Sequence, residues 1–174
     1  MTRFRTKYRF LYIAVWSAAA IALSIIEGLI PMPPLIYGAK PGLANIVSMA
    51  AIELLGVRSA LFVVIIRCTA AAMLTGTVVA LPYSLAGGIA ACLVMAAAYK
   101  MANGYISFVG ISVLGAAAHS LGQIIVAAFL VGSRGIFMYL PLLMLISSAL
   151  GIFTGLCANF LVFEIKKHSF GRLS

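Results

Sequence analysis

The sequence predicts an all-α membrane protein, a compact bundle of six transmembrane helices with both termini in the cytoplasm. Composition, the length of the apolar runs and the placement of charge all predict this class. The 174 residues are 64% apolar with a mean hydropathy of +1.18, well above the level of ordinary soluble domains. Apolar runs of about 20 residues recur along the chain, and each is long enough to cross a bilayer core of about 30 Å.

The first predicted helix follows a basic segment, residues 1–9, and covers Phe10–Ile30. Its start resembles a secretory signal, but a cleaved apolar region has roughly 7–15 residues, and this run is longer. We therefore expect an uncleaved membrane helix. The connection after it, Pro31–Gly42, contains four prolines and two glycines, so we expect a stiff extended loop. This loop either covers a pocket or is an ordinary connector.

The remaining apolar runs predict five more helices. They are Gly42–Leu55, which is short, Ser59–Val79, Pro82–Tyr99, Ile106–Val131 and Tyr139–Phe163. Tight loops between them place consecutive helices antiparallel and adjacent. No long polar linker interrupts the runs, so we expect one transmembrane domain over residues 10–163, followed by a basic cytoplasmic tail over residues 164–174.

The twelve lysines and arginines give a net charge of +9, and their placement orients the chain. With a cytoplasmic N-terminus, nine fall on the inner side, two on the outer side and one, Arg67, within the membrane. The inner group is Arg3, Arg5, Lys7, Arg9, Arg58, Lys100, Lys166, Lys167 and Arg172, and the outer group is Lys40 and Arg134. This positive-inside asymmetry predicts a multi-pass protein of the plasma membrane whose basic face meets anionic lipid. Nucleic acid is not an expected partner.

Polar residues inside the predicted helices are the candidate functional residues. Arg67 lies in the middle of Ser59–Val79. An arginine there costs roughly 2.5–3.5 kcal/mol on insertion scales and by default faces a cavity or a partner. His119 and Gln123 are four residues apart, so both project from one helix face. Gly115, one turn earlier on that face, is expected to leave room beside them.

At about 1.5 Å of rise per residue, these side chains gather between mid-depth and the outer side together with Glu27, Lys40 and Asn45. The arrangement predicts a pocket that opens outward. Arginine binds carboxylate or phosphate bidentately, so we expect an anionic ligand. The alternative is a structural network in which Arg67 pairs with Glu27 or Glu53 and His119 bonds to a backbone carbonyl.

Several residue types that catalysis requires are absent. The chain has no aspartate and only three glutamates, whereas Mg²⁺ bound to a diphosphate needs clustered carboxylate oxygens. It also lacks the glycine-rich P-loop of ATPases. Cys68, Cys92 and Cys157 have no spacing typical of a metal site or a disulfide. We therefore expect no catalysis by this chain alone, no metal and no cofactor.

Small residues recur every fourth position in two of the predicted helices. Ala14, Ala18 and Ala22 do so in the first, and Gly151 and Gly155 in the last. Such faces let helix backbones approach closely in a membrane. They serve either packing within the monomer or docking of another membrane protein, and the sequence leaves both open.

Several segments resemble the Gx transporter family, whose members are often labelled heptaprenyl diphosphate synthase component I. They are Lys40–Val47, Arg67 in its apolar helix, Ser84–Gly88 and Val113–Gln123. The resemblance runs from about Trp16 to Phe163, and the segment around His119 is its most specific part. Ser120 departs from it, because an asparagine is expected after the histidine.

This family is similar to the substrate-binding (S) components of energy-coupling factor (ECF) transporters. The resemblance implies six helices that capture a small molecule from outside beneath a first-loop lid, and a transmembrane coupling subunit driven by two ATPases. The implied ligand-site residues are Lys40, Asn45, Arg67, His119 and Gln123, to which the depth argument adds Glu27. The implied docking residues are Ala14, Ala18 and Ala22.

The resemblance leaves the ligand open between a quinone or isoprenoid precursor and a flavin-like molecule. It also leaves an alternative function open. The chain could be a non-catalytic membrane subunit that associates with a prenyl diphosphate synthase, in heptaprenyl diphosphate or menaquinone synthesis, or with flavin-linked electron transfer.

Overall fold

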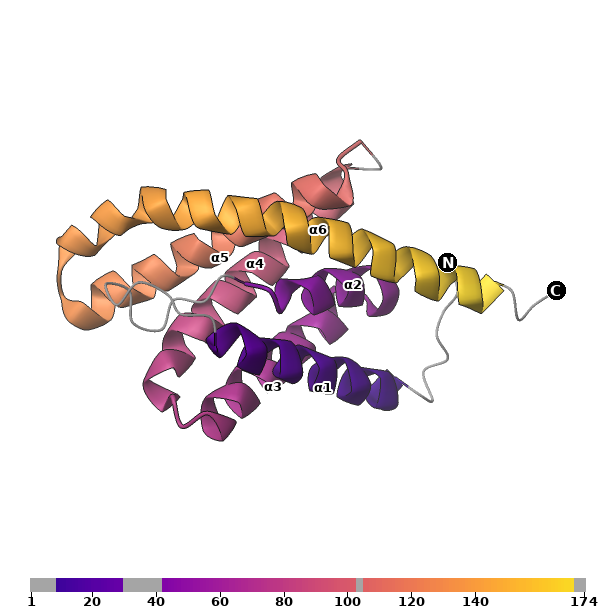
Figure 1. The fold of residues 1–174 in the computed structure, drawn as a ribbon, viewed down its shortest axis with the longest axis horizontal. Coiled ribbons are helices and arrows are strands. Elements are labelled where there is room, and N and C mark those ends of the chain that lie inside the picture. The colour runs from indigo at the N-terminus through magenta and orange to yellow at the C-terminus, as the bar shows by residue number, and fades with distance from the viewer. Residues whose placement is uncertain (1–8, 30–41, 103–104, 171–174) are drawn as a thin grey trace.

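The computed structural model describes residues 9–29, 42–102 and 105–170, and every regular element in these ranges is helical. Figure 1 shows the helices gathered into one bundle. They are α1 (Arg9–Gly28), α2 (Asn45–Leu55), α3 (Val57–Leu74), α4 (Leu81–Ala102), α5 (Phe108–Val131) and α6 (Leu140–Phe170), with short 3-10 helices η2 (Val78–Ala80) and η3 (Arg134–Tyr139). All of the α-helices except α2 are long and apolar enough to cross a membrane. The predicted class, an all-α multi-pass membrane protein, is confirmed.

Several helices differ in length from the prediction, and three of the differences are informative. With 11 residues, α2 is about 16 Å long, roughly half of the bilayer core, so the count of six full spans stays a prediction. The third helix ends at Leu74 rather than Val79, and Gly76 follows with a φ of 68°, a left-handed conformation that ends helices. The last helix continues to Phe170, past the predicted end at Phe163.

Successive helices run in opposite directions through the bundle (Figure 1). α5 packs most extensively against α6 and α4, whereas α1 packs mainly against α3, and α2 contacts α1, α3, α4, α5 and α6. The starts of α1, α3 and α5 therefore share one side of the bundle with the ends of α2, α4 and α6. We call this side the basic end, because it carries Arg9, Arg58, Lys100, Lys166 and Lys167.

Side-chain contacts tie the helices together at the basic end. Arg9 donates to the Ser59 hydroxyl from Nε and Nη2, at 3.0 and 2.9 Å, which joins α1 to α3. Lys166 on α6 forms an ion pair with Glu53 on α2. Glu53 therefore pairs with a lysine at this end, and it does not pair with Arg67 in the middle of α3.

The surface of α1 is inverted relative to that of a soluble helix. Its buried residues are Ser17, Ala20, Ser24 and Glu27, which are small or polar. Large apolar side chains such as Phe10 and Ile26 are exposed instead. Positions 17, 20, 24 and 27 lie on one helix face, so α1 turns its polar face to the bundle and its apolar face to lipid.

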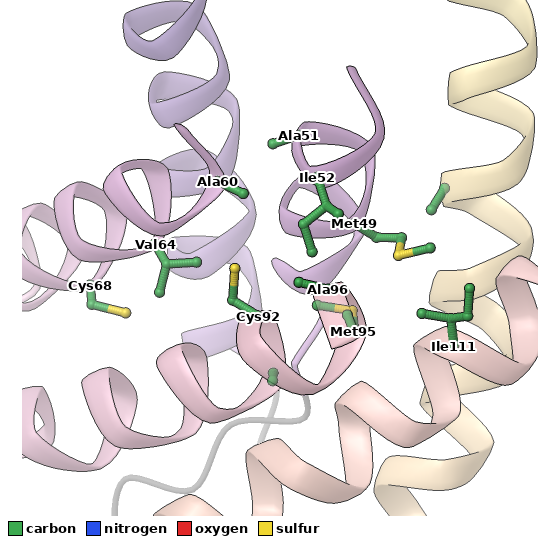
Figure 2. Close-up of a cluster of buried hydrophobic side chains, with 12 residues drawn as sticks. Met49, Ala51, Ile52, Ala60, Val64, Cys68, Cys92, Met95, Ala96 and Ile111 are labelled. Atoms are coloured by element: carbon green, nitrogen blue, oxygen red, sulfur yellow. The ribbon is translucent and has the colours of Figure 1, made fainter. Parts of the chain in front are cut away.

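The main apolar core lies between α2, α3 and α4 (Figure 2). Met49, Val64, Cys92 and Met95 are fully buried within it. A Cβ added at Gly115 of α5 would lie 2.4 Å from Met95 Cγ. The space expected beside Gly115 is therefore filled by Met95, and the room next to His119 comes from another glycine pair.

The seam between α5 and α6 depends on small residues. A Cβ on Gly151 would lie 2.9 Å from Val113 Cα, and one on Gly155 would lie 2.6 Å from Val109 Cα. Buried hydroxyl pairs, Ser112 with Thr154 at 2.8 Å and Ser120 with Ser147, cross the same seam. The glycine pair thus packs within the monomer, and Ser120 has a structural partner on α6.

Candidate functional site

A buried guanidinium forms the centre of the candidate site. Arg67 is 3% exposed and lies where α1, α2 and α3 meet. Its Nη1 donates to the Ser24 hydroxyl at 3.4 Å, and its Nη2 donates to the Asn45 side-chain oxygen at 3.3 Å. Within the described ranges its Nε has no hydrogen-bond partner, and no carboxylate forms an ion pair with it. The expected alternative, a structural network in which Arg67 pairs with a glutamate and His119 bonds to a backbone carbonyl, stays a prediction beside the pocket.

His119 and Gln123 lie one turn apart on α5 and contact each other. Both are buried, and the Gln123 side-chain nitrogen lies 3.0 Å from His119 Nε2. In this assignment the amide donates, so Nε2 accepts and the imidazole proton resides on Nδ1. The Gln123 side-chain oxygen has no partner among the residues that the structure describes.

Glu27 connects the end of the first loop to α1. Its Oε1 accepts hydrogen bonds from the backbone N–H groups of Gly42 and Leu43, the latter at 2.9 Å. Gly42 has a φ of 89°, a conformation that glycine adopts without strain. The carboxylate thus fixes the segment that enters α2. Lys40 lies outside the described residues, and its place in the site stays a prediction.

Arg67 and His119 both line a hollow at the end of the bundle opposite the basic end. The enclosed space is about 10 Å³, room for about one water molecule, and the empty volume including the open part is about 370 Å³. Its lining residues are Ser24, Glu27, Arg67, Cys68, Ala71, Ala72, Thr77, Ala80, Ser84 and His119. Asn45 and Gln123 do not line it, but they hydrogen bond to Arg67 and His119.

Two glycines on α4 make room for these side chains. A Cβ on Gly87 would lie 2.9 Å from Gln123 Cγ and 3.1 Å from His119 Cε1. A Cβ on Gly88 would lie 2.8 Å from Val64 Cγ1 and 3.1 Å from Arg67 Nη2. The Gly87–Gly88 pair therefore lets α4 pass directly against both polar groups.

We expect Gly88→Ala to displace the Arg67 guanidinium and to destabilise the protein by about 1–2 kcal/mol, because the new methyl group overpacks the interior. Thermal unfolding in detergent checks this. The control is Ala97→Val, an exposed position on the same helix. Equal melting temperatures for the two variants would contradict the packing that we describe.

Some lining residues were not predicted from the sequence. Ser24, Cys68, Thr77 and Ser84 line the hollow, and of these only Ser84 falls in a segment singled out by the family resemblance. Ser24 could have been found, because it lies three residues before Glu27 and so on the same face of α1. Serine, threonine and cysteine are otherwise ordinary in membrane helices and give no signal of their own.

The small residues of α1 are placed differently from those of α6. Ala14, Ala18 and Ala22 are all exposed, on a face that α1 does not bury against the described part of the bundle. This face is free of large side chains at three successive turns.

In a comparison with known protein families, residues 16–161 match the heptaprenyl diphosphate synthase component I family. The chain belongs to this family. The comparison with curated proteins and the comparison with solved structures both give no match. The match begins at Trp16 in α1 and ends at Leu161 in α6. It therefore includes Arg67, His119 and Gln123. It confirms the family resemblance seen in the sequence. The family name describes a component of a synthase. The chain itself contains no aspartate, whereas Mg²⁺ bound to a diphosphate needs clustered carboxylate oxygens.

Proposed function

We propose that the chain is the membrane-embedded substrate-binding component of an ECF-type transporter. In this function it captures a small, anionic molecule from outside in the hollow beside Arg67, and partner ATPases drive uptake. The observation that carries the proposal is a buried guanidinium with incomplete hydrogen bonding that lines an open hollow. A structural arginine is normally held by a carboxylate, because an unpaired buried charge is strongly destabilising.

The proposed orientation follows the distribution of charge. The basic end faces the cytoplasm by the positive-inside rule, so the hollow at the opposite end opens to the outside of the plasma membrane. Energy must then come from other proteins, because the chain has no P-loop. The exposed alanines of α1 offer a docking face for a coupling subunit.

A bulky residue on this alanine face is expected to block assembly without disturbing the fold. Ala18→Trp places a large ring where a partner helix would have to approach closely, and it should reduce co-purification of the coupling subunit and its two ATPases at least about tenfold. The measurement is affinity purification from cells that produce all four proteins. Ala97→Trp, on the exposed face of α4, is the matched control. Equal recovery with both variants would exclude α1 as the docking face.

The family name supports a second candidate function. A component of heptaprenyl diphosphate synthase could serve as a non-catalytic membrane subunit that holds an aspartate-rich synthase at the bilayer. The exposed cations of the basic end, among them Arg58, Lys100 and Lys167, would be its contact surface. This candidate predicts co-purification with a prenyl diphosphate synthase that is lost at high salt. Isolation with the coupling subunit and ATPases, and without a synthase, would reject it.

A further inference from the structure

All but one of the polar side chains that line the hollow already have a bonding partner among the residues that the structure describes. These side chains are Ser24, Glu27, Arg67, Cys68, Thr77 and His119. The Ser24 hydroxyl accepts from Arg67, for example, and the Thr77 hydroxyl shares a hydrogen bond of 2.6 Å with Thr75. Exchanging one hydrogen bond for another yields little net free energy. A captured molecule therefore has to compete with these existing bonds.

Ser84 is the exception among the lining residues. It is half-buried, and within the described ranges its hydroxyl takes part in no hydrogen bond. Its backbone carbonyl oxygen accepts from the Cys68 thiol at 3.4 Å, which ties the first turn of α4 to α3. The backbone of Ser84 is therefore fixed beside the hollow, while its hydroxyl is available to another molecule.

The helix α4 places Ser84 about one turn outward from the guanidinium. A Cβ on Gly88 would lie 3.1 Å from Arg67 Nη2, so α4 passes the guanidinium at this residue. Ser84 precedes Gly88 by four residues and lies on the same face of α4, about 6 Å nearer to the start of the helix. That start is at the end of the bundle opposite the basic end. A molecule that lies beside Arg67 and extends outward therefore comes within reach of Ser84.

We propose that Ser84 is a specificity-determining residue of the site. Its hydroxyl bonds to a polar group of the captured molecule, about one helical turn outward from the anionic group beside Arg67. A hydroxyl both donates and accepts, so it serves a carbonyl or a hydroxyl group of that molecule. A molecule that is apolar at that distance, such as a prenyl chain attached to an anionic group, leaves the Ser84 hydroxyl unpaired and binds less tightly. This inference rests on the proposed function, because it adds a second recognised group to the same site.

Retention of the small molecule that co-purifies in mild detergent tests this contact. Ser84→Ala removes the hydroxyl and should lower the amount that mass spectrometry detects per protein, after identical washing, about two- to tenfold, the range for one hydrogen bond. Ser84→Thr keeps a hydroxyl and should restore retention. Both variants should melt at the wild-type temperature, because the Ser84 hydroxyl makes no bond within the described part of the protein. Thr69→Ala, which removes an exposed hydroxyl of α3 that does not line the hollow, should not change retention.

A thiol at the same position tests whether the side chain opens into the hollow. Ser84→Cys is made in a background without other thiols. That background carries Cys68→Ser, Cys92→Ala and Cys157→Ala. The rates of modification are measured in detergent with an anionic and a cationic reagent, 2-sulfonatoethyl and 2-(trimethylammonium)ethyl methanethiosulfonate. Both should react, and the ratio of the anionic to the cationic rate should fall at least about threefold on Arg67→Gln, because a cation one turn away attracts the anionic reagent. Arg58→Gln, which removes an exposed arginine of the same helix as Arg67, should leave the ratio unchanged.

Four results would overturn the inference: full retention by Ser84→Ala, equal losses in Ser84→Ala and Ser84→Thr, a thiol at position 84 that neither reagent modifies, or an unchanged rate ratio in folded Arg67→Gln. The pair of Ser84 variants tests the contact even if Arg67→Gln does not fold. Full retention by Ser84→Ala, together with loss of the molecule from Arg67→Ala, leaves the proposed capture function in place and removes only the contact at Ser84. If no small molecule co-purifies with the wild type, the proposed function and this inference fall together.

Discussion

Arg67→Ala is expected to give a folded protein that no longer retains its small molecule. Removing one partner of a buried charge pair costs about 2–5 kcal/mol of binding free energy, which corresponds to at least about thirtyfold in affinity. Stability should suffer little, because the wild-type guanidinium has only two long bonds to neutral partners. The measurement is mass spectrometry of the small molecules that co-purify with wild type and variant in mild detergent.

Two companion variants sharpen this experiment. His119→Ala removes the second polar group that lines the hollow and should also reduce retention. Arg58→Ala removes an exposed arginine from the same helix and should have no effect. Full retention by Arg67→Ala, with normal folding, would show that the guanidinium does not contact the ligand.

Gly155→Ala is expected to cause the largest loss of stability, about 3 kcal/mol, at the upper end of the usual range for overpacking. The added Cβ would lie 2.6 Å from the backbone Cα of Val109, and backbone cannot move aside as a side chain can. The helices α5 and α6 must separate, which also stretches the hydrogen bond between Ser112 and Thr154. Chemical or thermal unfolding in detergent measures the effect.

The matched control for this prediction is Gly110→Ala on α5. A Cβ there would meet the Cγ2 methyl group of the Ile106 side chain at 2.9 Å and the Ser107 hydroxyl at 3.7 Å. Its effect should be smaller than that of Gly155→Ala, because both contacts are with side chains, which shift more easily than the backbone of Val109. If Gly155→Ala were as stable as Gly110→Ala, the close approach of α5 to α6 would be incorrect.

The sequence predicted the polar groups in and beside the hollow better than the space around them. Arg67, His119 and Gln123 could be found because a polar side chain in an apolar helix is costly and therefore conspicuous. The space was misplaced, because Met95 from another helix fills the gap at Gly115. Contacts between helices that are distant in sequence depend on rotation and tilt, which a periodic pattern does not specify.

The number and type of helices were predictable from apolar run length, whereas several helix ends were not. Val78 and Val79 continue the apolar run of α3, but Gly76 adopts a left-handed conformation and η2 follows. At the other end of the chain, Glu164 and His168 are polar yet still helical, with His168 Nε2 3.7 Å from a carboxylate oxygen of Glu164 one turn away. The end of an apolar run therefore does not predict the residue at which a helix ends.

The shortness of α2 has a consequence for the backbone that precedes it. A helix of 11 residues is shorter than the hydrocarbon layer of about 30 Å, and within that layer lipid offers no water to peptide groups outside a helix. Gly42 and Leu43 are such peptides, and the Glu27 carboxylate accepts both of their N–H groups. Glu27 thus takes the place of water as the hydrogen-bond acceptor for the backbone just before α2.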